Sequence, residues 1–330
     1  GNPNFIGSFF GMFSALLFTY LFNPESSWKI RMACIGLLAL TFIGIVETNA
    51  VHGEVLFVAA LGISLFYFVR SKFQFVLADL VYILLAVVGF LFALFGTLQK
   101  GPLASVLYKE TVSLRGQYWH AGWNTGSQNP WFGAGFDSYG DWYRVARDAD
   151  ALITPGATVT TNVAHNVYID FASNGGFFLL LTFSALFGAT FFYSFNALRK
   201  LRNFDALLIS CLSVWVVYLI TAFFSIDQLG LAVWGWVIGG ALIGISKNIL
   251  SSGDIAVDKS KKISAAERSK MIERNTTNAL IPQLLMFLIF VGAVTPAFKG
   301  DLDWAEARRS GQAQTIAAQL VKWPQDEIRY

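Results

Sequence analysis

The sequence predicts an all-α fold, a polytopic bundle of membrane-spanning helices with one long polar loop. The first observation is composition: 55% of the residues are hydrophobic and only 14% are charged, which is too apolar for a soluble globular domain. The second is that the apolar residues form unbroken runs of about 20, the helix length that crosses a bilayer core. In hydrocarbon, a run of this length satisfies its backbone groups as a helix.

Eight apolar runs are long enough to span a membrane. Seven lie in a predicted membrane domain, residues 1–250, and the eighth follows a polar stretch at 251–279 that is interpreted as a cytoplasmic linker. Residues 299–330 resemble the start of an extracytoplasmic, tetratricopeptide-like helical domain. The chain has no initiator Met or signal peptide, so both ends are interpreted as cuts in a longer protein. The eight runs are 5–22, 30–47, 53–70, 75–98, 175–195, 206–226, 229–248 and 280–298.

Basic residues near the helix ends predict the orientation. The hairpins at 47–53 and 225–230 contain no Lys or Arg, whereas the alternate turns VRSKF (69–73) and LRKLRN (198–203) are rich in both. The positive-inside rule therefore places the long loop between the fourth and fifth spans, residues 99–174, on the outer side. The predicted location is a bacterial inner membrane, with this loop periplasmic or extracellular.

Arg115 is the first candidate in this loop for binding a ligand. Outside the cell there is no nucleotide pool, so a membrane enzyme acting there uses a lipid-linked or gradient-driven substrate. A lipid diphosphate requires fixed positive charge, which arginine supplies in planar, bidentate form. Trp119 and Trp123 follow Arg115 at helical spacing and form one stripe with it. The alternative is an arginine that only anchors the loop to lipid headgroups.

Arg144 and Arg147 are further basic candidates, but acidic residues surround them. Asp141, Asp148 and Asp150 predict ion pairs with these arginines on a solvated helix. Asp148 and Asp150 also have the Asp-x-Asp spacing by which many glycosyltransferases hold a divalent ion. Because such short matches are common by chance and nucleotide-sugar donors are absent outside, no metal is predicted.

His165 is the candidate general base. It stands just before a spanning helix on the outer side, where a neutral imidazole can take a proton near neutral pH. The alternative is a structural histidine. Asn166 is interpreted as the N-cap of that helix. The stretch NPWFGAGF (129–136) predicts a turn whose glycines permit positive φ.

Four motifs in this order resemble the O-antigen ligase and polymerase superfamily: GNPN (1–4), SLRGQYW (113–119), NPWFGAGF (129–136) and AHNVYIDFASNGGF (164–177). The resemblance covers roughly residues 1–250. It implies a membrane glycosyltransferase of the GT-C class that acts in the cell envelope, in polysaccharide biosynthesis. Such an enzyme moves glycan from an undecaprenyl-diphosphate carrier to a glycan, lipid or protein acceptor, without a metal or another cofactor.

The resemblance also implies roles for individual residues. Arg115 binds the donor diphosphate, and His165 activates the acceptor hydroxyl for an inverting attack on the anomeric carbon. His52, in AVHGEV (50–55), stands where many members have an arginine and is a further candidate for the diphosphate. The supporting candidates are Trp119, Asn166, Arg144 and Arg147.

Two other kinds of function stay open. The departure at AVHGEV favours a non-catalytic membrane subunit that docks a partner through the outer loop and C-terminal helices. Polar residues at the outer hairpin, residues 47–52, raise a proton-relay or transport role, although few charges lie mid-membrane. No nucleic acid partner is expected, and ligase, polymerase and protein O-glycosyltransferase are not distinguished.

Overall fold

The structure is a computed structural model that describes residues 2–73, 76–97, 100–104, 114–201 and 203–257, and single positions between 285 and 311. It divides into two compact units, Gly1–Ala256 and Val257–Tyr330. Every regular element in the described ranges is helical, which confirms the all-α prediction. Most of the predicted linker, last span and C-terminal domain lies outside the described residues.

Six helices of the described chain are long and apolar enough to cross a membrane. They confirm a polytopic membrane bundle and six of the eight predicted spans. The predicted span at 75–98 forms helix α4 (Val76–Thr97), whose described apolar part, Leu80–Gly96, is shorter than the other six. The six are α1 (Pro3–Phe22), α2 (Trp28–Glu47), α3 (Val51–Phe73), α9 (Val167–Lys200), α10 (Ala206–Phe224) and α11 (Leu229–Val257).

Helix α1 lies at the centre of the packing, where it contacts α2, α3 and α10. Glycines allow its close approach to α3: a Cβ added to Gly11 would lie 2.6 Å from the Leu56 Cβ, and one added to Gly7 would lie 3.2 Å from the Gly53 Cα. Small residues of this kind are what membrane helices use to pack backbone against backbone. The α1–α3 pair therefore forms a firm support for His52, which lies in the first turn of α3.

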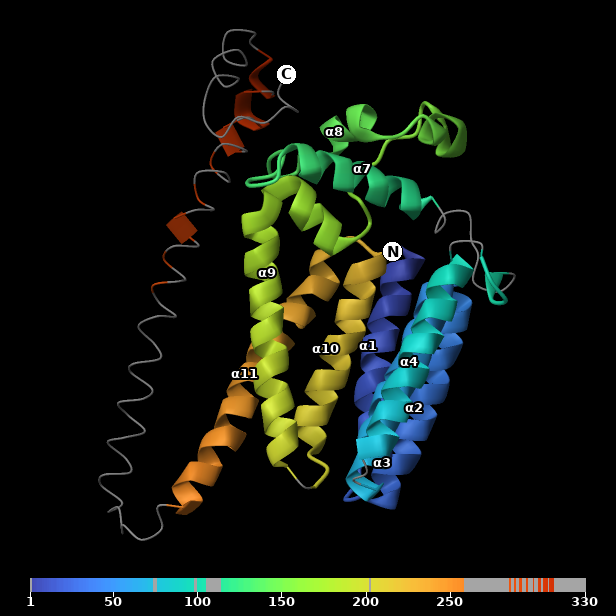
Figure 1. Cartoon of the computed structure of the whole chain (residues 1–330), viewed down its shortest axis with the longest axis vertical. Helices are drawn as coiled ribbons and strands as arrows, with labels where there is room; N and C mark the ends of the chain where they lie inside the picture. The colour runs from blue at the N-terminus through green and yellow to red at the C-terminus, as the bar shows by residue number, and fades with distance from the viewer. Residues whose placement is uncertain are drawn as a thin grey trace. The chain divides into compact units, whose positions relative to one another are not determined.

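The polar loop forms a layer across one end of the bundle, built from α7 (Arg115–Gln128) and α8 (Tyr139–Ala146) (Figure 1). Tyr139 and Tyr143 of α8 are fully buried against α7, so this layer has a small core of its own. The start of α1, the α2–α3 hairpin and the end of α10 lie at the same end of the bundle. The predicted inner turns include Arg70, in the last turn of α3, and Lys200, in the last turn of α9. Both helices begin at the end of the bundle that carries the polar layer, so these residues lie at the other end.

Helix α9 is broken near its start, and the loop at 129–136 fills the break. Gly176 has φ 65° and ψ −163°, which interrupts the helix. The amide groups of Phe177 and Phe178 donate to the carbonyls of Pro130 and Trp131, so the loop replaces hydrogen bonds that the helix loses. The turn prediction is confirmed, since Gly133 and Gly135 both have positive φ.

Candidate functional site

Arg115 begins α7 as a buried positive charge. Its side chain is only 8% exposed, and its Nη1 donates to the carbonyl oxygen of Phe224 at the end of α10. Within the described part of the chain no carboxylate pairs with it, and its Nε is buried without a partner. Burial lowers the pKa of Arg115, yet guanidinium stays charged in proteins. Because a buried, unpaired charge is costly, the site is suited to an anion.

Two more polar side chains gather with Arg115 around Phe224. The His52 ring lies 6.3 Å from the Phe224 ring, and the Trp119 ring also lies 6.3 Å from it. Among the described residues, neither the His52 Nε2 nor the Trp119 Nε1 has a hydrogen-bond partner, although both atoms are buried. The structure therefore brings together three predicted site residues from two distant parts of the chain. Each leaves a nitrogen that a ligand could satisfy.

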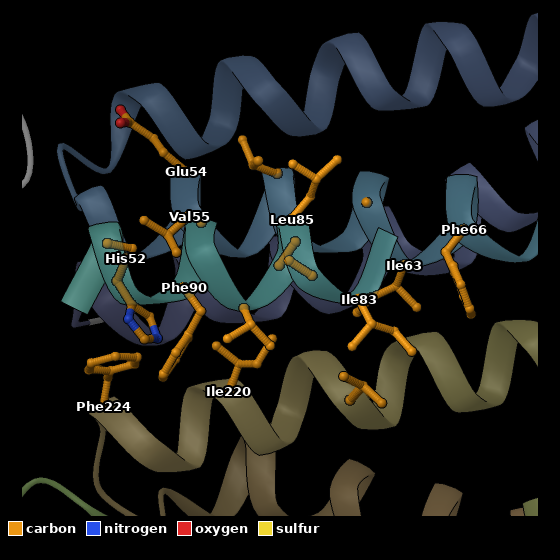
Figure 2. A pocket seen from close by; sticks show the side chains of 18 of the residues that line it. His52, Glu54, Val55, Ile63, Phe66, Ile83, Leu85, Phe90, Ile220 and Phe224 are labelled. Atoms are coloured by element: carbon orange, nitrogen blue, oxygen red, sulfur yellow. The ribbon is translucent and has the colours of Figure 1, made fainter. Parts of the chain in front are cut away.

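An apolar cavity of about 1020 Å³ runs from this group into the bundle between α3, α4 and α10. His52 and Arg115 line it together with aliphatic and aromatic side chains such as Val55, Phe90 and Ile220. Figure 2 shows the His52 ring directed toward Phe224, whereas the Glu54 carboxylate points away from them. The volume is at the upper end of ordinary ligand sites, and most of the lining side chains are apolar, with Arg115 and His52 together at one end. Such a cavity fits a lipid with a charged headgroup.

His165 lies in the turn that precedes α9, beside helix α7. Its Nδ1 is 3.2 Å from the carbonyl oxygen of Val163, so Nδ1 carries the hydrogen and Nε2 keeps a free lone pair. Its ring packs 5.5 Å from that of Tyr118, which lies one turn after Arg115. Burial lowers the pKa of His165 and the charge of Arg115 acts in the same direction, while the Val163 bond opposes them. The imidazole is therefore neutral at pH 7.

Asn166 has the N-cap role predicted for it. Its Oδ1 accepts from the amides of Tyr168 and Ile169 at 3.0 and 3.2 Å. The side chain is buried, and both of these hydrogen bonds lie within its own helix start. Asn166 thus helps to hold the turn that carries His165.

Arg147 was predicted to pair with neighbouring aspartates, but in the structure it contacts backbone carbonyls. Arg147 donates to the carbonyls of Ala157 and Val159 at 3.0 and 3.1 Å, so it ties α8 to the following segment. Asp148 instead pairs with His120 of α7, with 2.6 Å between Nδ1 and Oδ2. Arg144 is exposed on α8. Neither arginine lies in the group around Phe224.

Three residues of the site were missed from the sequence. Phe224 appears there as one more apolar residue of a span. Asp170 is buried within the first turns of α9 and accepts a hydrogen bond from the Ala164 amide. Asp227, in the turn between α10 and α11, accepts from the Tyr218 hydroxyl at 3.2 Å, and burial raises its pKa. The sequence signal that could have identified Asp170 and Asp227 is an acidic residue beside an otherwise apolar span.

The fold and the site together define the class. The chain is a multi-pass helical membrane protein with a cationic site at the head of an apolar cavity. A comparison with protein families matches residues 36–184 to the O-antigen ligase family. Residues 36–184 thus match an O-antigen ligase domain, and the resemblance to the O-antigen ligase superfamily is confirmed. A search of curated proteins finds no match.

The matched region runs from α2 into α9 and contains His52, Arg115, Trp119 and His165. At the level of the family, this match supports an O-antigen ligase or polymerase type of membrane glycosyltransferase in polysaccharide biosynthesis. The family uses lipid-linked glycan donors and glycan acceptors in a membrane.

Proposed function

We propose that the chain transfers glycan from an undecaprenyl-diphosphate carrier to an acceptor hydroxyl at the outer face of a bacterial inner membrane. The observation that carries this proposal is the position of Arg115. It is a buried cation, without an ion-pair partner in the described chain, between an apolar cavity and His165. Ligase, polymerase and protein O-glycosyltransferase activities share the step that this arrangement supports.

The donor lipid occupies the cavity with its diphosphate at Arg115. The first isoprene units lie between α3, α4 and α10, among apolar side chains. The diphosphate accepts from Arg115, from the Trp119 indole N–H and from His52, which have unsatisfied buried nitrogens in the described structure. Arginine gives planar, charge-assisted recognition of phosphate oxygens. Binding then removes the cost of three unpaired polar groups at once.

His165 acts as the general base of the transfer. Its Nε2 takes the proton of the acceptor hydroxyl while that oxygen attacks the anomeric carbon from the face opposite the diphosphate. The bond from the anomeric carbon to the phosphate oxygen breaks, and its electron pair leaves with the carrier diphosphate. Arg115 stabilises the negative charge that develops there. The new glycosidic bond has inverted configuration, and no metal takes part.

The test is glycan transfer by the purified full chain in lipid nanodiscs, with a synthetic polyprenyl-diphosphate oligosaccharide as donor. We expect His165→Ala to lower the rate by about 10²- to 10⁴-fold, the usual contribution of a general base. Arg115→Ala should abolish donor binding. EDTA should have no effect.

Matched variants separate these roles from general damage to the loop. His120→Ala removes an exposed histidine of the same layer, and Arg144→Ala an exposed arginine; both should transfer at the wild-type rate. Wild-type transfer by His165→Ala would remove the general base from the proposal. A wild-type protein that binds donor without transferring to any acceptor would favour the non-catalytic subunit.

A further inference from the structure

His165 has a backbone conformation that its surroundings must maintain. Its φ is +57°, in the left-handed region that residues other than glycine seldom adopt. Such a conformation is strained and persists only where neighbouring contacts determine it. The contacts on either side of His165 therefore help to set the orientation of its imidazole ring.

The residue before His165 is held by a buried carboxylate. The Oδ1 of Asp170 accepts from the backbone amide of Ala164 at 2.6 Å, and Asp170 is only 7% exposed. The amide of Asp170 in turn donates to the carbonyl oxygen of Asn166 at 2.9 Å. Asp170 of α9 is thus hydrogen-bonded to the residues on both sides of His165, Ala164 and Asn166.

The imidazole itself depends on the same turn. Its Nδ1–H donates to the carbonyl of Val163, which also accepts from the Thr161 hydroxyl at 2.8 Å. The direction of Nε2 therefore follows from the placement of residues 163–166. If Ala164 were released, the left-handed conformation at His165 would lose its main restraint.

We propose that Asp170 is a positioning residue, which holds the turn at 163–166 so that the His165 Nε2 faces the acceptor. This inference rests on the proposed function. Asp170 acts through the backbone of Ala164 and does not touch the substrate. Donor binding at Arg115, His52 and Trp119 is separate from it, so the effect of Asp170 belongs to the transfer step.

The experiment compares kcat, donor KM and donor binding in nanodiscs. Asp170→Ala should lower kcat about 10- to 100-fold, the scale of a misplacement by about 1 Å, and leave donor KM and binding unchanged. Asp170→Asn keeps an oxygen for the Ala164 amide and should restore most of the rate. Asp170→Glu keeps a carboxyl group but shifts it by one methylene, so it should lower kcat even if the alanine variant fails to fold.

Asp205 provides the matched control. Its Oδ1 accepts from the Leu208 amide at 2.9 Å, at the start of α10, whereas the other end of α10 contacts Arg115 through Phe224. Asp205→Ala removes a similar hydrogen bond and should leave kcat unchanged. Equal loss of rate in Asp170→Ala and Asp205→Ala, or wild-type kcat in both Asp170→Ala and Asp170→Glu, would overturn the positioning role. Loss of rate in His165→Ala but not in the Asp170 variants leaves the proposed function intact; wild-type rate in His165→Ala overturns that function itself.

Discussion

The charge of Arg115 acts on the pKa of His165. The guanidinium lies close enough to His165 to lower its pKa, in the same direction as burial. A histidine with a lowered pKa stays neutral until the pH falls below its ordinary value of 6.5. The cation that is proposed to bind the diphosphate therefore also keeps the base unprotonated.

This coupling predicts a pH dependence. Transfer should fall as the pH drops through the pKa of His165, and this acid limb should lie below pH 6.5 because only neutral imidazole accepts a proton. Arg115→Gln removes a positive charge and should move the titration of His165 to higher pH, as followed by NMR of the labelled histidine. Arg144→Gln should leave it unmoved. An unchanged midpoint in Arg115→Gln would contradict the coupling.

The sequence indicated which residues belong to the candidate site better than it indicated their hydrogen-bond and ion-pair partners. Arg115, Trp119 and His165 were visible because polar side chains are few in an apolar chain, and Asn166 because caps have a local pattern. The prediction that Arg147 pairs with a neighbouring aspartate was wrong. Its guanidinium donates instead to the backbone carbonyls of Ala157 and Val159, which the sequence does not show to be nearby. The role of Asp170 depends on a turn whose path no local pattern specifies.

At the scale of elements, the break in α9 joins this helix to the polar layer through the loop at 129–136. Gly176 has φ and ψ values that are essentially reserved for glycine. An added Cβ would lie 2.5 Å from backbone atoms of Trp131, Phe132 and Gly133. The break therefore depends on one residue and on the loop that packs against it.

Gly176→Ala should accordingly destabilise the protein by at least about 1–3 kcal/mol from backbone strain alone. The melting temperature in detergent measures this. Gly188→Ala is the matched control, because Gly188 lies in the same helix with no atom within 4 Å of an added Cβ. It should be neutral or slightly stabilising. Equal melting temperatures for the two variants would show that the loop does not depend on this glycine.

A second pair of glycines tests the cavity. Gly89 of α4 lines it, and no atom lies within 4 Å of a Cβ added there. Gly89→Trp should therefore fit into the fold but fill the cavity, and so raise the donor KM. Gly36→Trp, on α2 and equally open but not among the lining residues, should leave the KM unchanged. A normal KM in both would place the donor chain elsewhere.

The helices themselves were well predicted, because a bilayer imposes a length and composition that can be counted. Six of the eight predicted spans match described helices that are long and apolar enough to cross a membrane, and a seventh forms α4. The start of α9 at Val167 agrees with the predicted N-cap at Asn166, although the apolar span was predicted to begin only at residue 175, eight residues later. The cause is physical: its first turns lie in the polar layer, where a helix needs no apolar run.

For the whole molecule, the positive-inside pattern predicts which end faces outward. In a chain whose Cys34 and Cys211 are replaced, Val145→Cys on the exposed face of α8 should react with a membrane-impermeant maleimide added to intact cells. Glu25→Cys, in the exposed turn between α1 and α2, should react only after the membrane is opened. The reverse pattern would place the outer layer in the cytoplasm and remove the proposed orientation.

The central claim is that one lipid-linked donor joins the cavity, Arg115 and His165. A cryo-EM map of the full chain in nanodiscs, with a non-hydrolysable polyprenyl-diphosphate sugar, tests it most directly. We expect density for the prenyl chain between α3, α4 and α10, the diphosphate at Arg115, and the anomeric carbon within reach of an acceptor held at the His165 Nε2. Donor density on another surface, with the cavity empty and Arg115 uncontacted, would contradict the account.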